Sequence, residues 1–283
     1  MKLLEKSCYY NRGIKLAQSI TGDYEKPVTF HSFWTGNLNE KHFYSVLSCY
    51  YFNVHSNNNN KIIVWIENNV ENEYNEKISQ YAEIRQFNFE EEKNKVKFLN
   101  NKSINYPKKL PFYSDCIRHL LLYTYGGCWF DLDCFFLRSF SPIFKNYESE
   151  ICVYQWEKQR HPNGAIYISL EPESEKMKHI IEFVIERNHG WDFRTANLTY
   201  NLPLDILVLP CSWFDAEWLP SPFSIGGFDN FFKNSEKQYN FDNFYKDSFC
   251  YHWHNRWNVE IEENSIIKQL VNIILTNLPK NIC

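Results

Sequence analysis

The sequence has 283 residues and a formal net charge of -4 at neutral pH, and 44% of its residues are hydrophobic. Aromatic residues make up 18% of the chain and charged residues 23%, which excludes a disordered chain and predicts one folded domain over 1–283. The basic residues are scattered along the chain, so we expect no nucleic-acid partner.

The pattern of apolar residues and cysteines bears on the location of the protein. The longest apolar runs are shorter than the roughly 20 residues that a spanning helix needs, so no transmembrane segment is expected. The start of the sequence lacks the apolar stretch of a cleavable signal peptide. The nine cysteines are odd in number and form no C-x-x-C pair, which favours a reducing compartment. We therefore expect a cytoplasmic protein.

Strand and helix patterns alternate through the first half of the chain. After a short helical lead-in over 1–26, strands are predicted at 28–34, 61–66, 83–89, 128–137, 150–155, 164–169 and 206–209. Helices are predicted at 39–53 with Asn39 as N-cap, 72–82, 112–125, 174–188 and, at the C-terminus, 263–283, with helix and loop over 90–108. This alternation predicts an α/β fold with a mostly parallel central sheet flanked by helices, whose ligands bind at the carboxyl ends of the strands.

The predicted strand 128–137 carries two aspartates, Asp131 and Asp133, and no other charge. Because side chains alternate along a strand, both carboxylates point to the same face. Buried carboxylates without a partner are costly, so a divalent cation, Mn²⁺ or Mg²⁺, is the natural group to neutralise the pair. The alternative is a strand that simply ends in solvent.

The helix before this strand supplies a second feature. Asp115 and Arg118 are three residues apart and share one helix face. The pair Gly126-Gly127 ends the helix and permits a tight turn that brings this face beside the two aspartates. Alone, Asp115 and Arg118 would form a surface ion pair, but the composite spacing favours a functional site.

The segment from Ser114 to Leu137 resembles the sugar-binding region of DXD-containing glycosyltransferases. That family includes α-mannosyl, α-galactosyl and capsular polysaccharide transferases, with the clostridial glucosylating toxins as distant relatives. The resemblance is looser over 28–257. It implies a GT-A fold and retaining transfer of a sugar from a nucleotide-sugar donor, with a UDP-sugar favoured and a GDP-sugar possible. The acceptor would be a glycan or a protein.

The resemblance also implies roles for individual residues. Asp131 would face the ribose and sugar of the donor, and Asp133 would bind the metal ion directly; we predict these two as the catalytic residues. Asp115 and Arg118 would hold hydroxyl groups of the donor sugar. The other predicted donor-binding residues are Phe33, Trp34, Gly127, Asn163, Arg256 and Trp257, with Trp34 stacked on the nucleobase.

The segment Tyr251–Trp257 resembles the C-terminal histidine-aromatic motif of related transferases. His252, or less well His254, would complete the metal shell, while Arg256 and Trp257 would meet the diphosphate. Alternation would place both histidines on one face of a strand. Three alternatives remain open here: a zinc site, an edge strand with solvent-facing histidines, and a core role for Trp34.

Two other functions fit parts of the pattern. Aspartyl-phosphate phosphatases also place D-x-D at the end of an apolar strand, but they favour Thr or Val where this chain has Phe135. A non-catalytic protein that binds carbohydrates or nucleotide sugars would suit the many Trp and Tyr residues. Donor hydrolysis or transfer with Mn²⁺ would separate an enzyme from such a binding protein.

Overall fold

The computed structural model describes residues 2–3, 10–55, 59–100, 110–156, 162–187 and 206–279. Within these ranges an eight-stranded sheet has the order β1-β9-β7-β8-β5-β2-β3-β4. Its strands are β1 (Lys2–Leu3), β2 (Thr29–Thr35), β3 (Lys61–Glu67), β4 (Glu83–Gln86), β5 (Gly127–Phe130), β7 (Ile151–Gln155), β8 (Asn163–Ser169) and β9 (Ile206–Pro210). Two further strands, β6 (Cys134–Phe136) and β10 (Cys250–His252), form a separate antiparallel pair.

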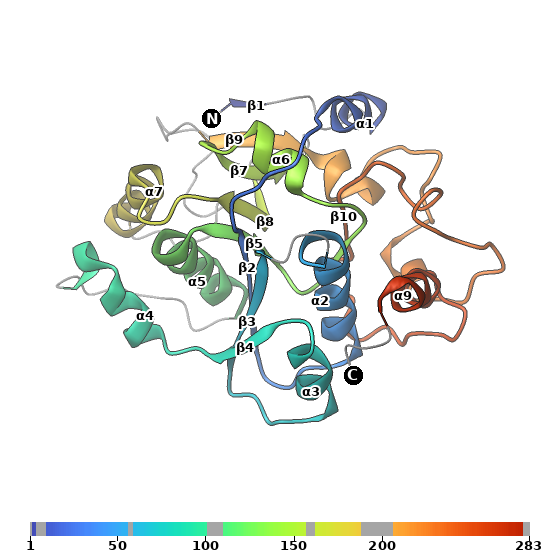
Figure 1. Cartoon of the computed structure of the whole chain (residues 1–283), viewed down its shortest axis with the longest axis horizontal. Coiled ribbons are helices and arrows are strands. Elements are labelled where there is room, and N and C mark those ends of the chain that lie inside the picture. Colours follow the sequence, from blue (N-terminus) through green and yellow to red (C-terminus); the bar gives the residue numbers. More distant parts are fainter. Residues whose placement is uncertain are drawn as a thin grey trace.

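Most neighbouring strands of the sheet run parallel. Five neighbouring pairs are parallel, and the two antiparallel pairs both involve β8. Helices cover both faces, with α4, α5 and α7 on one side and α1, α2 and α6 on the other (Figure 1). The predicted α/β class, with a mostly parallel central sheet flanked by helices, is confirmed.

The helices of the described ranges agree with most of the predicted ones. They are α1 (Tyr10–Ser19), α2 (Glu40–Asn53), α3 (Glu73–Ser79), α4 (Phe89–Lys95), α5 (Leu110–Tyr125), α6 (Ser141–Asn146), α7 (Glu175–Arg187) and α9 (Ile266–Asn277). Short 3-10 helices are η1 (Lys97–Leu99), η2 (Cys211–Trp213), η3 (Ala216–Trp218) and η4 (Phe228–Phe231). Among these, no helix has the length and apolar character needed to cross a membrane. The predicted C-terminal helix contains α9, while residues 280–283 lie outside the described part, as do 1 and 4–9 of the lead-in.

Local signals set one end each of α2 and α5, the helices that contact β6 and β5. Asn39 caps α2, since its side chain accepts hydrogen bonds from the backbone N–H groups of Lys41 and His42. At the end of α5, Gly126 and Gly127 have φ angles of +64° and +110°. A Cβ on Gly127 would lie 2.1 Å from the carbonyl oxygen of Thr29 in β2, so only glycine allows this close approach.

The prediction of one continuous strand over 128–137 is wrong. Strand β5 ends at Phe130, and a turn closed by a 3.0 Å hydrogen bond from Cys134 N to Asp131 O precedes β6. The chain leaves the sheet here because β6 pairs with β10 instead of with a strand of the central sheet. The strand alternation that was expected to put Asp131 and Asp133 on one face therefore does not apply.

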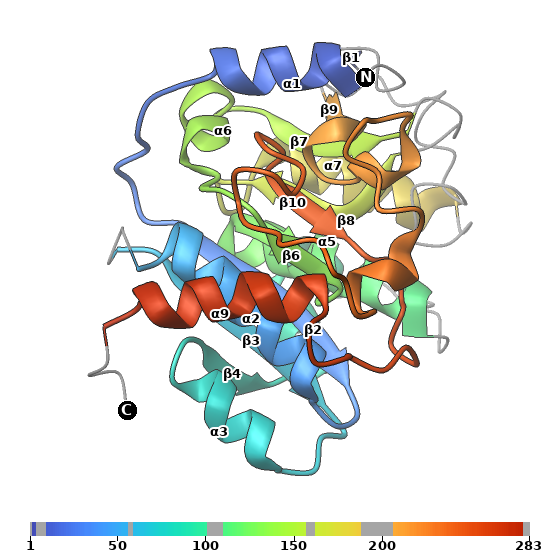
Figure 2. The same ribbon diagram turned by 90° about the vertical axis from the view of Figure 1, so that its right-hand side faces the viewer.

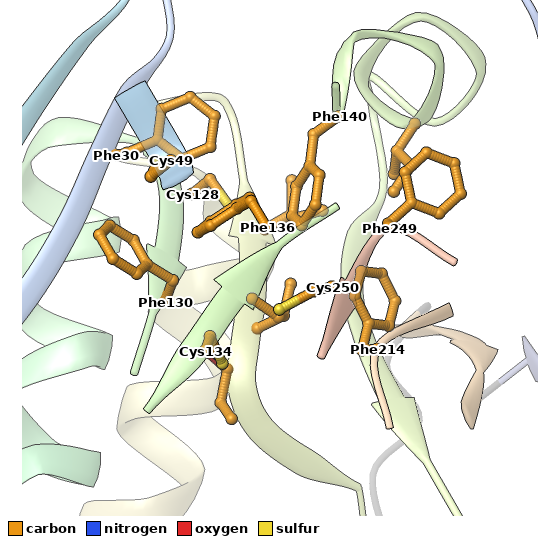
Figure 3. Packing of buried hydrophobic residues seen from close by; sticks show 14 of the residues in the cluster. Phe30, Cys49, Cys128, Phe130, Cys134, Phe136, Phe140, Phe214, Phe249 and Cys250 are labelled. Atoms are coloured by element: carbon orange, nitrogen blue, oxygen red, sulfur yellow. Dashed lines mark hydrogen bonds between the residues drawn. The ribbon is translucent and has the colours of Figure 1, made fainter. Parts of the chain in front are cut away.

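A phenylalanine-rich core holds the β6–β10 pair against the sheet. The pair lies in front of the sheet in Figure 2, beside the C-terminal segments of the chain. Phe136 of β6 packs against Phe30 of β2 and Phe130 of β5, with ring centroids 6.1 and 5.3 Å apart. Phe249 and Cys250 fill the far side of the same cluster (Figure 3). This packing fixes where the turn between β5 and β6 lies.

Candidate functional site

Asp131, at the carboxyl end of β5, is held by hydrogen bonds from two neighbouring side chains. Its Oδ1 accepts from the Trp129 indole N–H at 2.7 Å and lies 3.3 Å from a guanidinium nitrogen of Arg118. Its backbone N–H donates to the carbonyl of Ala165 in the adjacent strand β8 at 2.8 Å. The side chain remains 29% exposed, so the carboxylate still faces an open region.

Arg118 is a buried cation between two carboxylates. One of its guanidinium nitrogens lies 3.0 Å from Asp115 Oδ1, and the side chain is only 7% exposed. Burial alone would lower the pKa of Arg118, but the charges of Asp131 and Asp115 raise it overall. Gly164 leaves room for this group, since a Cβ there would lie 2.3 Å from the guanidinium. The structure thus brings Asp115, Arg118 and Asp131 together, as their spacing predicted.

Asp133 has different partners, which come from the C-terminal part of the chain. Its Oδ1 lies 3.2 Å from His252 Nε2, and its Oδ2 accepts a 2.7 Å hydrogen bond from the backbone N–H of Asn255. Burial raises the pKa of Asp133, but His252, the Asn255 N–H and His254 together outweigh it and lower this pKa to about 2. Conversely, burial lowers the pKa of His252, and the charge of Asp133 raises it well above its ordinary value. In the absence of a metal ion the two groups form a buried ion pair.

The pairing of β6 with β10 explains this meeting of distant residues. In its antiparallel register His252 stands opposite Cys134, and the Trp253 N–H donates to the Asp133 carbonyl at 3.0 Å. Beyond His252 the strand ends, because His254 and Asn255 adopt left-handed φ angles of +51° and +57°. The prediction that alternation puts both histidines on one face of a strand is therefore wrong, because His254 lies beyond the end of β10. The turn nevertheless brings the two rings together, with centroids 3.9 Å apart.

Asp215 is a functional candidate that the sequence analysis missed. It is 3% exposed and lies between η2 and η3, and both of its carboxylate oxygens are 2.8 Å from His254 Nε2. The same imidazole nitrogen is 2.6 Å from the indole nitrogen of Trp218. The hydroxyl of Tyr154, also missed, lies 3.3 Å from Asp215. The sequence did hold a signal, since Asp215 is the only charged residue in the mainly apolar stretch from 206 to 216.

Two groups in the described part of the chain could hold a metal ion. The first is Asp133, Cys134 and His252, and the second is Asp215, His252 and His254, each with ligand atoms within 4.8 Å of one another. Burial raises the pKa of the Cys134 thiol well above its ordinary value, so this sulfur stays protonated and is a poor ligand for a hard cation. Asp133 and His252 are the residues whose oxygen and nitrogen atoms best suit Mn²⁺ or Mg²⁺.

Trp34 lies in an aromatic cluster with His42 and Trp257. Its ring centroid is 4.2 Å from that of His42 and 4.8 Å from that of Trp257, and the Trp257 and His42 rings stack. Lys41 holds the backbone beside Trp257, since its ammonium donates to the carbonyls of Trp257 at 3.3 Å and Val259 at 2.5 Å. The sequence analysis assigned no role to His42 or Lys41.

Phe33 and Gly127 lie apart from this cluster. Phe33 is 5% exposed and packs with Phe87 and Tyr113 in the core on the opposite side of the sheet from Trp34. Gly127 has its closest contact with Thr29, as described above. The Phe33 contacts are packing contacts between the sheet and the layer that covers it, and Gly127 makes a close backbone approach between β5 and β2.

Asn163 and Arg256, the remaining predicted residues, make polar contacts of their own. Asn163 accepts a 2.8 Å hydrogen bond from the backbone N–H of Ala165 at the start of β8. The guanidinium of Arg256 pairs with Asp229 at 2.8 Å and remains 42% exposed. Asn163 thus bonds to the backbone of its own strand, and Arg256 remains accessible to solvent.

Comparison with known proteins identifies the central part of the chain. Residues 45–150 match the glycosyltransferase sugar-binding region containing a DXD motif, a segment that includes Asp115, Arg118, Asp131 and Asp133. The prediction of a DXD-type sugar-binding region is confirmed. No curated protein matches the sequence.

Solved structures similar to this one include several glycosyltransferases. The PaToxG glycosyltransferase is 15% identical, with a TM-score of 0.45 over 69% of this chain and 76% of that chain. Mouse xyloside xylosyltransferase 1 is 13% identical, with a TM-score of 0.41 over 83% of this chain and 100% of that chain. The galactosyltransferase LgtC, solved with donor and acceptor sugar analogs, is 7% identical, with a TM-score of 0.47 over 89% and 98%.

Proposed function

We propose that this chain, a glycosyltransferase by the DXD sugar-binding region that it carries over 45–150, uses a nucleotide-sugar donor and a divalent cation. A UDP-sugar is the favoured donor and a GDP-sugar the second choice. The acceptor is a glycan or a protein, and the transfer retains the configuration of the sugar. The observation that carries the proposal is the buried contact of Asp133 with His252, next to the Asp115–Arg118–Asp131 cluster.

The residues around Asp133 fit a divalent cation. Asp133 Oδ1 and His252 Nε2 are 3.2 Å apart, a separation that one ion bound to both atoms can span. Both side chains are buried, and the ion would replace the proton that now lies between them. When bound, Mn²⁺ or Mg²⁺ would neutralise the charge that develops on the departing nucleoside diphosphate. His254 is proposed as a weaker candidate ligand.

The partly exposed side of Asp131 suits the donor sugar and ribose. Arg118 fixes the carboxylates of Asp131 and Asp115 in place, so their outer oxygens can accept hydrogen bonds from sugar hydroxyls. The Trp34–Trp257 pair, at the carboxyl end of β2, offers aromatic rings for a nucleobase. Arg256, at the same edge, is proposed to meet the diphosphate.

Three further residues are proposed to support donor binding: Asn163, Phe33 and Gly127. Asn163 precedes Gly164, where an added Cβ would meet the Arg118 guanidinium, so we propose that Asn163 lies near the donor sugar. Phe33 and Gly127 contribute through packing, because their contacts lie inside the protein. A cytoplasmic location remains a proposal that rests on the cysteine pattern of the sequence.

A panel of nucleotide sugars tests the function. Thermal unfolding with each donor, with and without Mn²⁺, should show one donor that raises the melting temperature only when the ion is present. That donor should then be hydrolysed or transferred in a Mn²⁺-dependent way. Binding without hydrolysis or transfer would favour the non-catalytic sugar-binding protein. A panel with no stabilising donor would contradict the proposal.

A further inference from the structure

A series of buried hydrogen-bonding groups connects Asp133 to Asp215. His252 contacts Asp133 through Nε2, and its other ring nitrogen, Nδ1, lies 2.9 Å from the hydroxyl of Tyr154. That hydroxyl lies 3.3 Å from Asp215 Oδ2, whereas His252 Nδ1 is 3.8 Å from the same oxygen. The link between His252 and Asp215 therefore passes through Tyr154.

The groups in this series are buried, so a hydrogen bond that is lost there cannot be replaced by water. Tyr154 is 1% exposed and Asp215 is 3% exposed. A buried carboxylate is costly unless it is paired and hydrogen-bonded. Within the described ranges, the ionic partners of Asp215 are the imidazoles of His252 and His254. Asp215 thus connects through Tyr154 to the proposed metal ligand His252.

The chemistry of the groups sets the direction of each hydrogen bond. An ionised carboxylate only accepts, so the Tyr154 hydroxyl donates its single proton to Asp215. The tyrosine oxygen then has only lone pairs to offer His252, and Nδ1 must carry the proton that joins them. With its one proton on Nδ1, a neutral His252 keeps the lone pair of Nε2 directed toward Asp133. That tautomer is the one that can ligate an ion at Asp133.

We propose that Tyr154 and Asp215 are positioning residues, which hold His252 in the tautomer and orientation that bind the metal ion. The inference rests on the proposed function, since it takes the ion to lie between Asp133 and His252. Neither residue touches the ion or the donor; each acts through the imidazole ring. Mutation of a residue that hydrogen-bonds to a metal ligand in this way typically lowers metal affinity by about 10–100-fold.

The chain offers a matched pair of variants. Tyr154→Phe removes the hydroxyl while keeping the ring that packs on Phe214, with centroids 5.3 Å apart. Tyr251→Phe removes an equally buried hydroxyl from the residue next to His252, but one with no hydrogen-bond partner among the described residues. Both changes delete one oxygen atom from a buried aromatic ring, and only the first breaks the series.

The test is a titration with Mn²⁺ alone, in which electron paramagnetic resonance measures the concentration of free Mn²⁺. We expect Tyr154→Phe and Asp215→Asn to bind Mn²⁺ about 10–100-fold more weakly than wild type, and Tyr251→Phe to bind like wild type. The bound ion in wild type should show the spin-echo modulation of an imidazole nitrogen, and Tyr154→Phe should weaken it. Thermal unfolding checks that each variant is folded; if Asp215→Asn is not, Tyr154→Phe decides.

The outcomes separate this inference from the proposed function. Equal Mn²⁺ affinity in Tyr154→Phe, Tyr251→Phe and wild type would overturn the positioning role and leave the metal site intact. A second Mn²⁺ that wild type binds and Asp215→Asn does not would also overturn it, because Asp215 would then be a ligand itself. A wild type that binds no Mn²⁺, or an Asp133→Ala variant that binds it normally, would overturn the proposed metal site and this inference together.

Discussion

Asp131 and Asp133 are two residues apart, yet two different regions of the chain hold them. The partners of Asp131 come from a short stretch of sequence, since Arg118 and Asp115 lie on α5, the helix immediately before β5. The partners of Asp133 come from the C-terminal region, and Asn255 is 122 residues away from it. The first region is fixed by a helix and a glycine turn, and the second by the pairing of β6 with β10.

This difference separates sugar recognition from metal binding in the proposed site. The Asp131 region is an ion-pair cluster with an outward-facing side, suited to hydroxyl groups. The Asp133 region is buried and pairs a carboxylate with an imidazole, suited to a cation. Each region can therefore be damaged separately, and the predictions below run from the largest expected effect to the smallest.

Removing the metal-binding carboxylate should have the largest effect on activity. We expect Asp133→Ala to lower donor turnover by about 10²–10³-fold or more, because the diphosphate loses the charge that stabilises its departure. EDTA should do the same to wild type. The measurement is donor hydrolysis with Mn²⁺, with Asp242→Ala, which removes an exposed carboxylate, as the control. Normal turnover in Asp133→Ala, or full activity in EDTA, would rule out this metal site.

Removing Arg118, the cation of the Asp131 region, should lower the free energy of unfolding. Arg118→Met leaves Asp115 and Asp131 without their common partner, and breaking such a buried pair costs about 3–5 kcal/mol. The measurement is the free energy of unfolding in urea. Lys178→Met, which breaks an exposed pair with Glu175 on α7, is the control and should leave that free energy unchanged. Equal stability of Arg118→Met and wild type would show that the cluster is not needed for the fold.

The same difference explains what the sequence could predict. The sequence could predict that Asp115 and Arg118 share a helix face and that a glycine turn follows, because helix periodicity and turn residues depend only on neighbouring residues. The turn at Asp131 could not be predicted, since nothing in the eight apolar residues of 128–137 shows that β6 leaves the sheet. Asp215 could be noticed as the one charge in an apolar stretch, but neither it nor Tyr154 could be placed at the site, because only the β6–β10 register brings His252 to them.

Replacing Trp34, the proposed nucleobase-stacking residue, should have an effect of intermediate size. If Trp34 stacks on the base, Trp34→Ala should weaken nucleotide binding by about 1–3 kcal/mol, the range for an aromatic ring on a base. Calorimetric titration with UDP measures it, with Phe223→Ala, an exposed aromatic position, as the control. Unchanged UDP affinity in Trp34→Ala would return the ring to a packing role with His42 and Trp257.

Two buried imidazoles near the site should respond to pH in opposite ways. Asp133 raises the pKa of His252, whereas burial lowers the pKa of His42 to about 3. In the unfolded chain His42 gains its proton near pH 6.5, so between pH 6.5 and 3 the unfolded state binds the extra proton. Stability should therefore fall on acidification by about 1.4 kcal/mol per pH unit from this group.

The pH prediction is checked by comparing wild type with His42→Asn. The free energy of unfolding is measured at several pH values between 6.5 and 4, where both proteins still fold. We expect the slope to be shallower in His42→Asn, because asparagine does not titrate. Parallel slopes in the two proteins would mean that His42 takes up its proton equally in the folded and unfolded states.

The smallest expected effect concerns the turn that aims the Asn255 N–H at Asp133. Asn255 has φ +57°, a conformation that glycine adopts freely, asparagine tolerates and alanine disfavours. Its side chain accepts a 3.1 Å hydrogen bond from Trp257, and both Asn255→Gly and Asn255→Ala lose that bond. The difference between the two variants therefore reports the backbone conformation alone.

We expect Asn255→Ala to be about 1 kcal/mol less stable than Asn255→Gly in urea unfolding. It should also bind Mn²⁺ more weakly, because its relaxed backbone withdraws the N–H from the carboxylate. If alanine and glycine behave alike at 255, the left-handed turn does not hold Asp133, and the burial of that carboxylate against His252 is sufficient to orient it.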